Sequence, residues 1–93
     1  MYTVEYTTQF KRAVKRCVKR GLDVNKIADL VDILREKGSL PSKYKPHKLS
    51  GFKGNCTWEC HIEPDWLLVW EQNDMRLTLL MLNTGSHSDL FKV

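Results

Sequence analysis

The sequence predicts an α+β fold, in which an N-terminal strand and an antiparallel helical hairpin accompany a small, twisted, mostly antiparallel sheet. Apolar residues recur at spacings of three and four between residues 8 and 38, which is the pattern of two helices. Three strand-like runs separated by turn residues follow between residues 56 and 82. A chain of 93 residues has room for one core. Residues 1–93 are therefore expected to form a single domain, with both helices on one face of the sheet.

A short strand and a first helix are predicted at the N-terminus. Val4 and Tyr6 alternate with polar residues, as expected of a strand. From Thr8, the predicted N-cap, the helical spacing of apolar residues continues to Gly21, which ends the helix. Six basic residues lie largely off this apolar stripe: Lys11, Arg12, Lys15, Arg16, Lys19 and Arg20.

A second helix is predicted from Asp23, its N-cap, to Gly38. The short connection between the two helices predicts an antiparallel hairpin. The segment 40–54 is predicted to be a loop, because Pro41 and Pro46 disfavour a helix. Loops of this length in small domains are often functional.

The runs "CTWECHIE", "WLLVWEQ" and "MRLTLLML" are the predicted strands, and turns at Pro64-Asp65 and Asn73-Asp74 join them. Such short connections give an antiparallel meander. Side chains of the first run alternate between two faces. The core face carries Cys56, Trp58, Cys60 and Ile62. The face expected to meet solvent or substrate carries Thr57, Glu59, His61 and Glu63.

The net charge of +4 and the isoelectric point near 9.1 arise from two blocks of basic residues. One block is the first predicted helix. The other, between Glu36 and Glu59, consists of Lys37, Lys43, Lys45, Lys48 and Lys53. The blocks indicate a polyanionic partner, either a nucleic acid or an acidic protein, although a solvated helix face and a lysine-rich loop would give the same pattern.

Neither a membrane span nor an export signal is visible. No apolar run reaches the roughly 20 residues of a membrane helix, and "MYTVEYTTQF" lacks the features of a signal peptide. We therefore expect a cytoplasmic protein without membrane attachment. Three cysteines without such a signal argue against a disulfide framework.

A zinc site at the two neighbouring cysteines is not expected either. On a strand, Cys56 and Cys60 would stand about 13 Å apart, whereas two thiolates on one zinc ion lie about 4 Å apart. The cysteines are interpreted as small apolar residues, and no metal or other cofactor is predicted.

All three histidines, His47, His61 and His87, fall in the C-terminal half of the chain. Histidine exchanges protons near neutral pH, so three that converge would suit acid–base chemistry. On the predicted strand, Glu59 and His61 share a face at a separation of about 6.6 Å. For each histidine taken alone, a solvated or structural role is the simpler interpretation.

The segments "HKLSG", "ECHIEPDWLLVW" and "NTGSHSDLF" follow a basic helical hairpin in this order. Together they resemble the YafQ-type toxins of the RelE/ParE superfamily over essentially the whole chain. The resemblance implies a RelE-like fold and the activity of an mRNA interferase, the toxin of a type II toxin–antitoxin pair. Such a toxin cleaves mRNA in the A site of the 70S ribosome and is silenced by its antitoxin.

The resemblance also implies the site residues. The family's catalytic set matches His47, His61, Asp65 and His87, and its acidic residue before the central histidine matches Glu59. RNA contacts are expected of Lys48, Lys53, Asn83 and Phe91. A turn at Thr84-Gly85 is predicted to fold the chain end back, with Leu90 or Phe91 as its anchor, so that His87 lies near His61.

The implied reaction is a metal-free transesterification, in which the RNA 2′-OH attacks the adjacent phosphate. It leaves a 2′,3′-cyclic phosphate and a 5′-OH. His87 is the expected general acid and His61 the base or its close partner, oriented by Glu59 or Asp65. His47 and Lys53 would hold the phosphate.

The implied partner is an antitoxin of the ribbon-helix-helix type. Such proteins are small dimers with a DNA-binding part and a toxin-wrapping, often acidic part, which implies a hetero-oligomer. The candidate dock is the basic face formed by Lys11, Arg12, Lys15 and Arg16. The same face could equally contact ribosomal RNA.

One departure from the family pattern is Asn83, which stands where an arginine usually precedes T-G-[ST]-H. Loss of one such electrostatic contact can cost about 10² to 10³ in rate. The alternative function is therefore a non-catalytic member of the same fold that binds RNA or the antitoxin. ParE-type relatives, which act on DNA gyrase, are not expected to carry this set of histidines.

Overall fold

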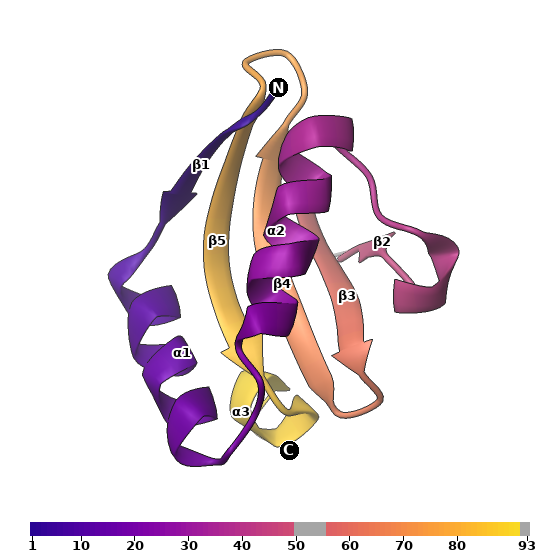
Figure 1. Cartoon of the computed structure of the whole chain (residues 1–93). Coiled ribbons are helices and arrows are strands. Elements are labelled where there is room, and N and C mark those ends of the chain that lie inside the picture. The colour runs from indigo at the N-terminus through magenta and orange to yellow at the C-terminus, as the bar shows by residue number, and fades with distance from the viewer. Residues whose placement is uncertain (50–55, 92–93) are drawn as a thin grey trace.

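A mixed five-stranded sheet runs through the molecule (Figure 1). The computed structural model describes residues 1–49 and 56–91. The strands are β1 (Thr3–Tyr6), β2 (His47–Lys48), β3 (Thr57–Glu63), β4 (Trp66–Asn73) and β5 (Thr78–Gly85). Their order is β1-β5-β4-β3-β2; β1 is parallel to β5, and the other neighbours are antiparallel. The predicted α+β fold with a mostly antiparallel sheet is confirmed.

Helix α1 (Thr8–Lys19) follows β1. Its N-cap is Thr7, whose Oγ1 accepts the backbone N–H of Phe10 at 3.0 Å. The predicted cap at Thr8 was therefore one residue late, because it is Thr7 that has the extended backbone of a capping residue. The hydroxyl of Thr7 also donates to the carbonyl oxygen of Met81 at 3.0 Å, which fixes the start of α1 to β5.

Helix α2 (Asn25–Lys37) runs back in the opposite direction to α1 (Figure 1). Its N-cap position is Val24 and not the predicted Asp23. The Asp23 carboxylate instead accepts the N–H two residues ahead at 3.1 Å, a local turn that aspartate forms readily. The predicted end at Gly38 is confirmed by a left-handed φ of 68°, which glycine adopts without strain.

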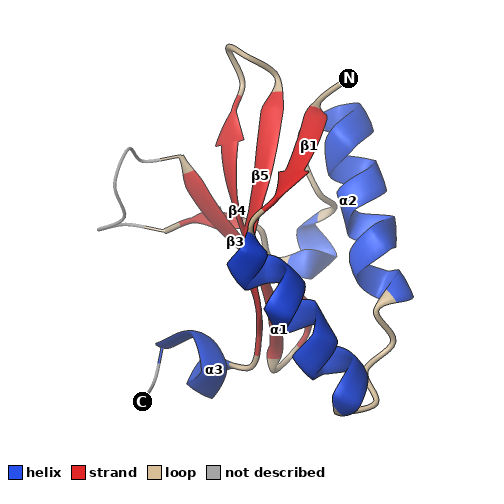
Figure 2. Ribbon diagram, turned by 90° about the vertical axis from the view of Figure 1, so that its left-hand side faces the viewer, coloured by secondary structure: helices blue, strands red, loops and turns tan. Residues whose placement is uncertain are grey.

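The hydrophobic core lies between these two helices and one face of the sheet (Figure 2). Trp66 and Trp70, which lie on the same face of β4, are buried in it. The other buried members are Phe10, Cys17, Ile27, Leu30, Val31, Leu34, Leu40, Cys60, Leu68, Leu79 and Met81. This packing uses the helix-facing side of the sheet and leaves its opposite side for other residues.

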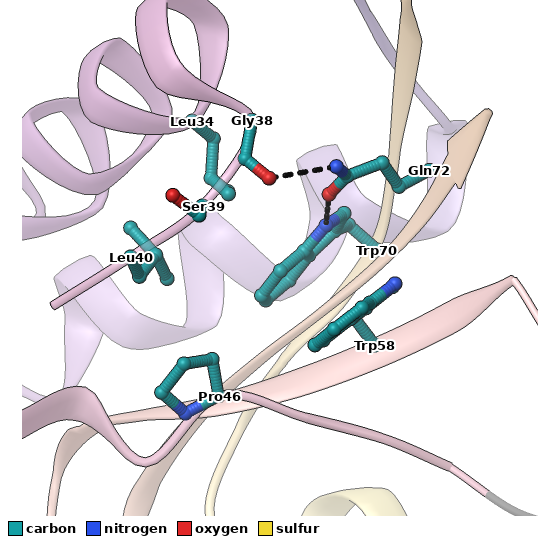
Figure 3. A pocket seen from close by; sticks show the side chains of 8 residues that line it. All are labelled: Leu34, Gly38, Ser39, Leu40, Pro46, Trp58, Trp70 and Gln72. Atoms are coloured by element: carbon teal, nitrogen blue, oxygen red, sulfur yellow. Dashed lines mark hydrogen bonds between the residues drawn. The ribbon is translucent and has the colours of Figure 1, made fainter. Parts of the chain in front are cut away.

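An apolar pocket of about 190 Å³ lies between the end of α2 and the sheet (Figure 3). Within it, the rings of Trp58 and Trp70 stack with centroids 6.3 Å apart. The side chain of Gln72 accepts the indole N–H of Trp70 at 3.0 Å and donates to the carbonyl oxygen of Gly38 at 2.8 Å. These bonds satisfy polar groups that would otherwise be buried without partners.

All three cysteines are free thiols. Cys17 and Cys60 are buried in the core, and burial raises the pKa of Cys60 to about 12, so its thiol stays protonated near neutral pH. In the described ranges, no three His, Cys, Asp or Glu side chains are grouped so that they could hold a metal ion. None of the helices in these ranges has the length and apolar character needed to cross a membrane.

Three elements were missed in the sequence. A short 3₁₀ helix (Ser42–Tyr44) and β2 interrupt the predicted loop 40–54, and α3 (His87–Phe91) follows β5. Each has five residues or fewer, which is too short for apolar periodicity to reveal. Figure 2 shows α3 on the opposite side of the sheet from α2.

The prediction that the second face of β3 is open was wrong in part. Thr57 and Glu59 are only 3% and 5% exposed. Strand β2 lies beside β3 and places His47 opposite Glu59. This pairing brings a side chain over the face that the sequence pattern assigned to solvent or substrate.

Candidate active site

The C-terminal segment leaves β5 through a buried threonine and a glycine. Oγ1 of Thr84 accepts the indole N–H of Trp66 at 3.0 Å and donates to the carbonyl oxygen of Leu67 at 2.7 Å. Gly85 follows with a φ of 153°, and a Cβ there would lie 2.7 Å from Oδ2 of Asp89. Both residues still pair with β4 as the end of β5, so the fold-back predicted at Thr84-Gly85 comes one residue later, at Ser86, and the close approach by Asp89 requires glycine at position 85.

Helix α3 begins with a capping box between Ser86 and Asp89. Oγ of Ser86 accepts the N–H of Asp89 at 3.1 Å, and Oδ2 of Asp89 accepts the N–H of Ser86 at 2.9 Å. Arg20 donates two hydrogen bonds to the same carboxylate. The bonds from Arg20, and then those from Ser86, hold the pKa of Asp89 well below its usual range. The S-x-x-D pattern was a readable signal for this anchor, which the sequence reasoning missed.

The fold-back brings His87 to Asp65, in the turn between β3 and β4, and to His61 on β3. Nδ1 of His87 lies 2.6 Å from Oδ1 of Asp65, which also accepts the backbone N–H of His87 at 2.9 Å. The ring centroids of His61 and His87 are 5.7 Å apart, and those of His87 and Phe91 are 6.4 Å apart. Four of the expected site residues, from two separate stretches of the chain, thus form one cluster.

The Asp65 contact determines which nitrogen of His87 faces outward. Hydrogen bonds from the backbone and then from the ring of His87 hold the pKa of Asp65 below its usual value, so the carboxylate is ionised at neutral pH. An ionised carboxylate can only accept, so Nδ1 of His87 carries a proton and Nε2 is left for a substrate. A carboxylate orients the catalytic imidazole of hydrolases in the same way.

The His61 ring has a different neighbour. Its Nδ1 lies 3.4 Å from the carbonyl oxygen of Pro64, at the long end of a hydrogen bond. A carbonyl oxygen only accepts, so this contact favours the tautomer with a proton on Nδ1 and a basic Nε2. The expectation that Glu59 or Asp65 orients His61 has no support in these contacts, because each carboxylate pairs with another histidine.

His47 and Glu59 form a second pair across β2 and β3. Nε2 of His47 lies 3.3 Å from Oε1 of Glu59, and its Nδ1 lies 3.0 Å from the carbonyl oxygen of Lys45. The carbonyl contact requires a proton on Nδ1, so a hydrogen bond to Glu59 needs one further proton, on the ring or on the carboxyl group. The pair can therefore hold a mobile proton.

Glu59 itself is unusual because its side chain is only 6% exposed. Its Oε2 is buried, and no hydrogen-bond partner for it exists among the residues the structure describes. Glu59 lies two residues before His61 on the same face of β3, which joins the pair to the His61–His87 cluster. Burying a carboxylate oxygen without a hydrogen bond costs free energy.

The remaining expected site residues are distributed less tightly. Lys48 lies opposite Trp58 in the β2–β3 pairing, with Nζ 5.7 Å from the Trp58 ring, on the face that points away from the histidines. Asn83 lies on β5 with its Oδ1 accepting the N–H of Thr84 at 2.9 Å. Lys53 falls outside the described residues.

A pocket of about 270 Å³ adjoins Phe91 and Asn83. Its other lining residues are Gln9, Leu49, Val69, Leu82 and Leu90. The sequence did not predict this pocket, because its lining comes from five separate segments.

The four basic residues of the predicted antitoxin dock on α1 do not all have the same surroundings. Lys11, Arg12 and Lys15 are exposed. Arg16 instead turns toward the C-terminal segment, where its guanidinium lies 3.4 Å from the carbonyl oxygen of Thr84 and 3.9 Å from Asp89. Arg16 is exposed as well, so it belongs to the basic face and contacts the C-terminal segment at the same time.

Known proteins resemble this chain over almost its full length. Residues 2–92 match the family described as a bacterial toxin of type II toxin–antitoxin systems, YafQ. The mRNA interferase toxin YafQ of Escherichia coli strain B / BL21-DE3 is 39% identical over 90 residues, covering 95% of this chain and 94% of that protein.

Two solved structures give the same result. A chain in the crystal structure of the E. coli DinJ–YafQ complex superposes with a TM-score of 0.86 at 38% identity, over 98% of this chain and 99% of that one. A metal-bound toxin from Helicobacter pylori superposes with a TM-score of 0.88 at 37% identity, over 98% of this chain and 100% of that one. The matching family and the fold, together with the clustered histidines, establish that this chain belongs to the YafQ family of bacterial type II toxins.

Proposed function

We propose that this toxin is a ribosome-dependent endoribonuclease that cleaves mRNA by attack of the RNA 2′-OH and so inhibits translation. The observation that carries the proposal is the cluster of His61, His87 and Asp65, with ring centroids 5.7 Å apart and a carboxylate on Nδ1 of His87. Relatives named mRNA interferases share the family. Dependence on ribosomes implies that the toxin acts in the cytoplasm.

The cluster supplies the groups that transesterification needs. His87, with Asp65 on Nδ1, is suited to carry a second proton on Nε2 and to give it to the leaving 5′-oxygen. His61 is suited to accept the proton of the 2′-OH through Nε2. Attack then forms the 2′,3′-cyclic phosphate while the P–O5′ bond breaks, and the two histidines end with exchanged protonation states.

The neighbouring pair has a supporting part in this scheme. When His47 carries a proton on both ring nitrogens, it is a cation that can lie beside the reacting phosphate. Glu59, whose Oε1 is 3.3 Å from Nε2 of His47, shares the second of these protons. Phe91, 45% exposed and 6.4 Å from the His87 ring, offers a surface on which a base can stack. Each proton transfer uses a side chain of this protein, so the proposed reaction is metal-free.

The test is cleavage of mRNA on programmed 70S ribosomes by the purified toxin, with the RNA ends mapped. We expect a 2′,3′-cyclic phosphate and a 5′-OH, at the same rate with and without EDTA under conditions that keep the ribosomes intact. Products with a 5′-phosphate, or activity that disappears with EDTA, would contradict the proposed chemistry. Cleavage of free RNA at the ribosomal rate would contradict ribosome dependence.

The second candidate is a non-catalytic toxin of the same fold that binds RNA or its antitoxin, and Asn83 is the observation that favours it. An amide at this position donates hydrogen bonds but supplies no charge to the phosphate. Growth arrest with intact transcripts on expression of the toxin would support this candidate. Arrest with cleaved transcripts would support the enzyme.

The proposed partner is a cognate antitoxin of the ribbon-helix-helix type that forms a hetero-oligomer with the toxin. The solved structure of the E. coli DinJ–YafQ toxin–antitoxin complex supports an antitoxin protein as the partner. The exposed residues Lys11, Arg12 and Lys15 on α1 are the proposed dock for acidic side chains of the antitoxin.

Reversing the charge at two of these positions should weaken the antitoxin complex. For Lys11→Glu/Lys15→Glu we expect a loss of affinity of about tenfold or more, because like charges then face the acidic partner. Binding is measured by titration calorimetry, and ribosomal cleavage is scored separately. The matched control is Lys37→Glu at the end of α2, and equal affinities for the double variant and the wild type would remove this face from the dock.

A further inference from the structure

We propose that Asp89 is a positioning residue for the cleavage reaction: by joining α3 to the end of α1 through Arg20, it holds His87 against Asp65. This inference rests on the proposed function. It adds a residue that lies outside the expected catalytic set, and it gives one arginine of the basic helix a part in the active site.

The carboxylate of Asp89 is the point where the tail meets the rest of the molecule. Oδ1 accepts from Arg20 at 3.0 Å, and Oδ2 accepts from Arg20 and from the Ser86 N–H. Nε of Arg16 adds a charge 3.9 Å away. The Asp89 side chain is 14% exposed, and its lowered pKa keeps it ionised throughout the neutral range.

Helix α3 needs such an attachment because it is too short to be stable alone. It has five residues, and isolated helices shorter than about 12 to 15 residues are marginal in water. None of its residues is fully buried. The capping box and the Arg20 contact therefore provide much of the order of α3.

The position of His87 depends on this order. His87 lies between the two residues of the capping box, and both its N–H and its Nδ1 point to Oδ1 of Asp65. Asp65 lies in a turn with a side chain that is 70% exposed, whereas that of Asp89 is 14% exposed, so water competes more strongly for the Asp65 contact than for the contacts of Asp89. A misplacement of about 1 Å in a catalytic group can cost about 10² in rate.

The residue before the capping box is also suited to this contact. A Cβ at position 85 would lie 2.7 Å from Oδ2 and 2.9 Å from Cβ of Asp89. Gly85 thus leaves the space in which the Asp89 side chain approaches the end of β5 and meets Arg20. A larger residue there would displace the carboxylate that we assign to positioning.

The kinetic test compares Asp89→Asn, Arg20→Gln and the double variant in single-turnover cleavage on ribosomes. We expect each single variant to lower the maximal single-turnover rate constant by about 10- to 100-fold, with the half-saturating concentration within about twofold of wild type. The double variant should be no slower than Asp89→Asn, because the two residues act as one unit. Lys19→Gln, which removes one charge from the same turn of α1, is the matched control and should keep the wild-type rate.

A second measurement tests positioning without RNA. Hydrogen exchange of the His87 amide, which donates to Asp65, should be protected in the wild type and in Lys19→Gln. In Asp89→Asn and Arg20→Gln it should be about tenfold faster. If Asp89→Asn does not fold, the test relies on Arg20→Gln. The Arg20 side chain is 45% exposed, so its replacement should leave the fold intact.

Two results would overturn the inference. One is a wild-type rate and wild-type His87 protection in both single variants. The other is slow cleavage with unchanged protection, since Asp89 would then act by some route other than the placement of His87. A third result would separate the two proposals. If the His87 amide is protected in the wild type and loses protection in both single variants, but the wild type cuts no RNA, the proposed function is contradicted and the placement of His87 by Asp89 is still supported.

Discussion

Replacing His87 with alanine should lower the single-turnover rate of mRNA cleavage on the ribosome by about 10² to 10⁴, the usual contribution of a general acid. The imidazole is the group that faces the proposed leaving oxygen, because Asp65 engages its Nδ1 at 2.6 Å and leaves Nε2 outward. The fold should persist, since the His87 side chain is 46% exposed. Binding of the toxin to ribosomes should therefore stay close to that of wild type.

The control for this variant is Ser88→Ala, a substitution at an exposed neighbour in α3. Its rate should equal that of the wild type. Near-normal cleavage by His87→Ala would exclude His87 from proton transfer. Because an acid is needed only for a poor leaving group, an RNA with a 5′-thio leaving group at the scissile bond should restore much of the lost rate if His87 is the acid.

The sequence predicted well where its patterns are long. The alternation in the first strand run placed Trp58 and Cys60 on the core face, and Cys60 is buried in the core with Trp58 packed against it. Both long helices lie where the apolar spacing put them, with errors of one residue at the caps of α1 and α2. In a long amphipathic helix or strand, many residues indicate the same periodicity, whereas the position of a cap depends on the backbone conformation of one residue.

The resemblance supplied a list of site residues, and the structure adds the contacts among them. The resemblance named His47, Glu59, Asp65 and His87, yet the partners of the two carboxylates could not be read from it. The pairing of Glu59 with His47 requires β2, which has two residues and no periodicity. Contacts between residues far apart in sequence depend on strand register, and register is a property of the whole sheet.

The sequence contains a signal for the C-terminal helix α3 that was not used to predict it. The Ser86-to-Asp89 spacing is that of a capping box, which a sequence alone can show. The contact of Asp89 with Arg20 could not be seen in the same way, because 68 residues separate the two and several arginines compete for the role. Local bonds can be predicted from spacing, and long-range ion pairs need the fold.

The position before Thr84 gives the second large prediction. Glu59, Val69 and Asn83 pair across β3, β4 and β5, so the three side chains lie in one row on the face that carries the histidines. Strands are spaced by about 4.8 Å, which puts the backbones of Glu59 and Asn83 about 10 Å apart. The family pattern has an arginine at this place, and this chain has an uncharged amide.

We expect Asn83→Arg to raise the single-turnover rate by about 10- to 100-fold, part of the 10² to 10³ that such a contact contributes elsewhere. A guanidinium extending along this row would approach the buried carboxylate of Glu59 and the phosphate bound beside His47, and it would stabilise the charge that builds up in the transition state. Among the described residues, the side chain of Asn83 makes one hydrogen bond, which it accepts from the N–H of Thr84, so little is lost by its removal.

The matched control is Asn83→Gln, which lengthens the side chain without adding charge and should give no gain. Rates are compared at low and at moderate salt, and the advantage of Asn83→Arg should shrink as salt screens the added charge. A variant no faster than wild type would mean that another cation already serves the phosphate. If the wild type is inactive and Asn83→Arg cleaves mRNA, the natural protein is the non-catalytic binder proposed as the second candidate. Its histidines would then be placed for catalysis, and only the charge at position 83 would be missing.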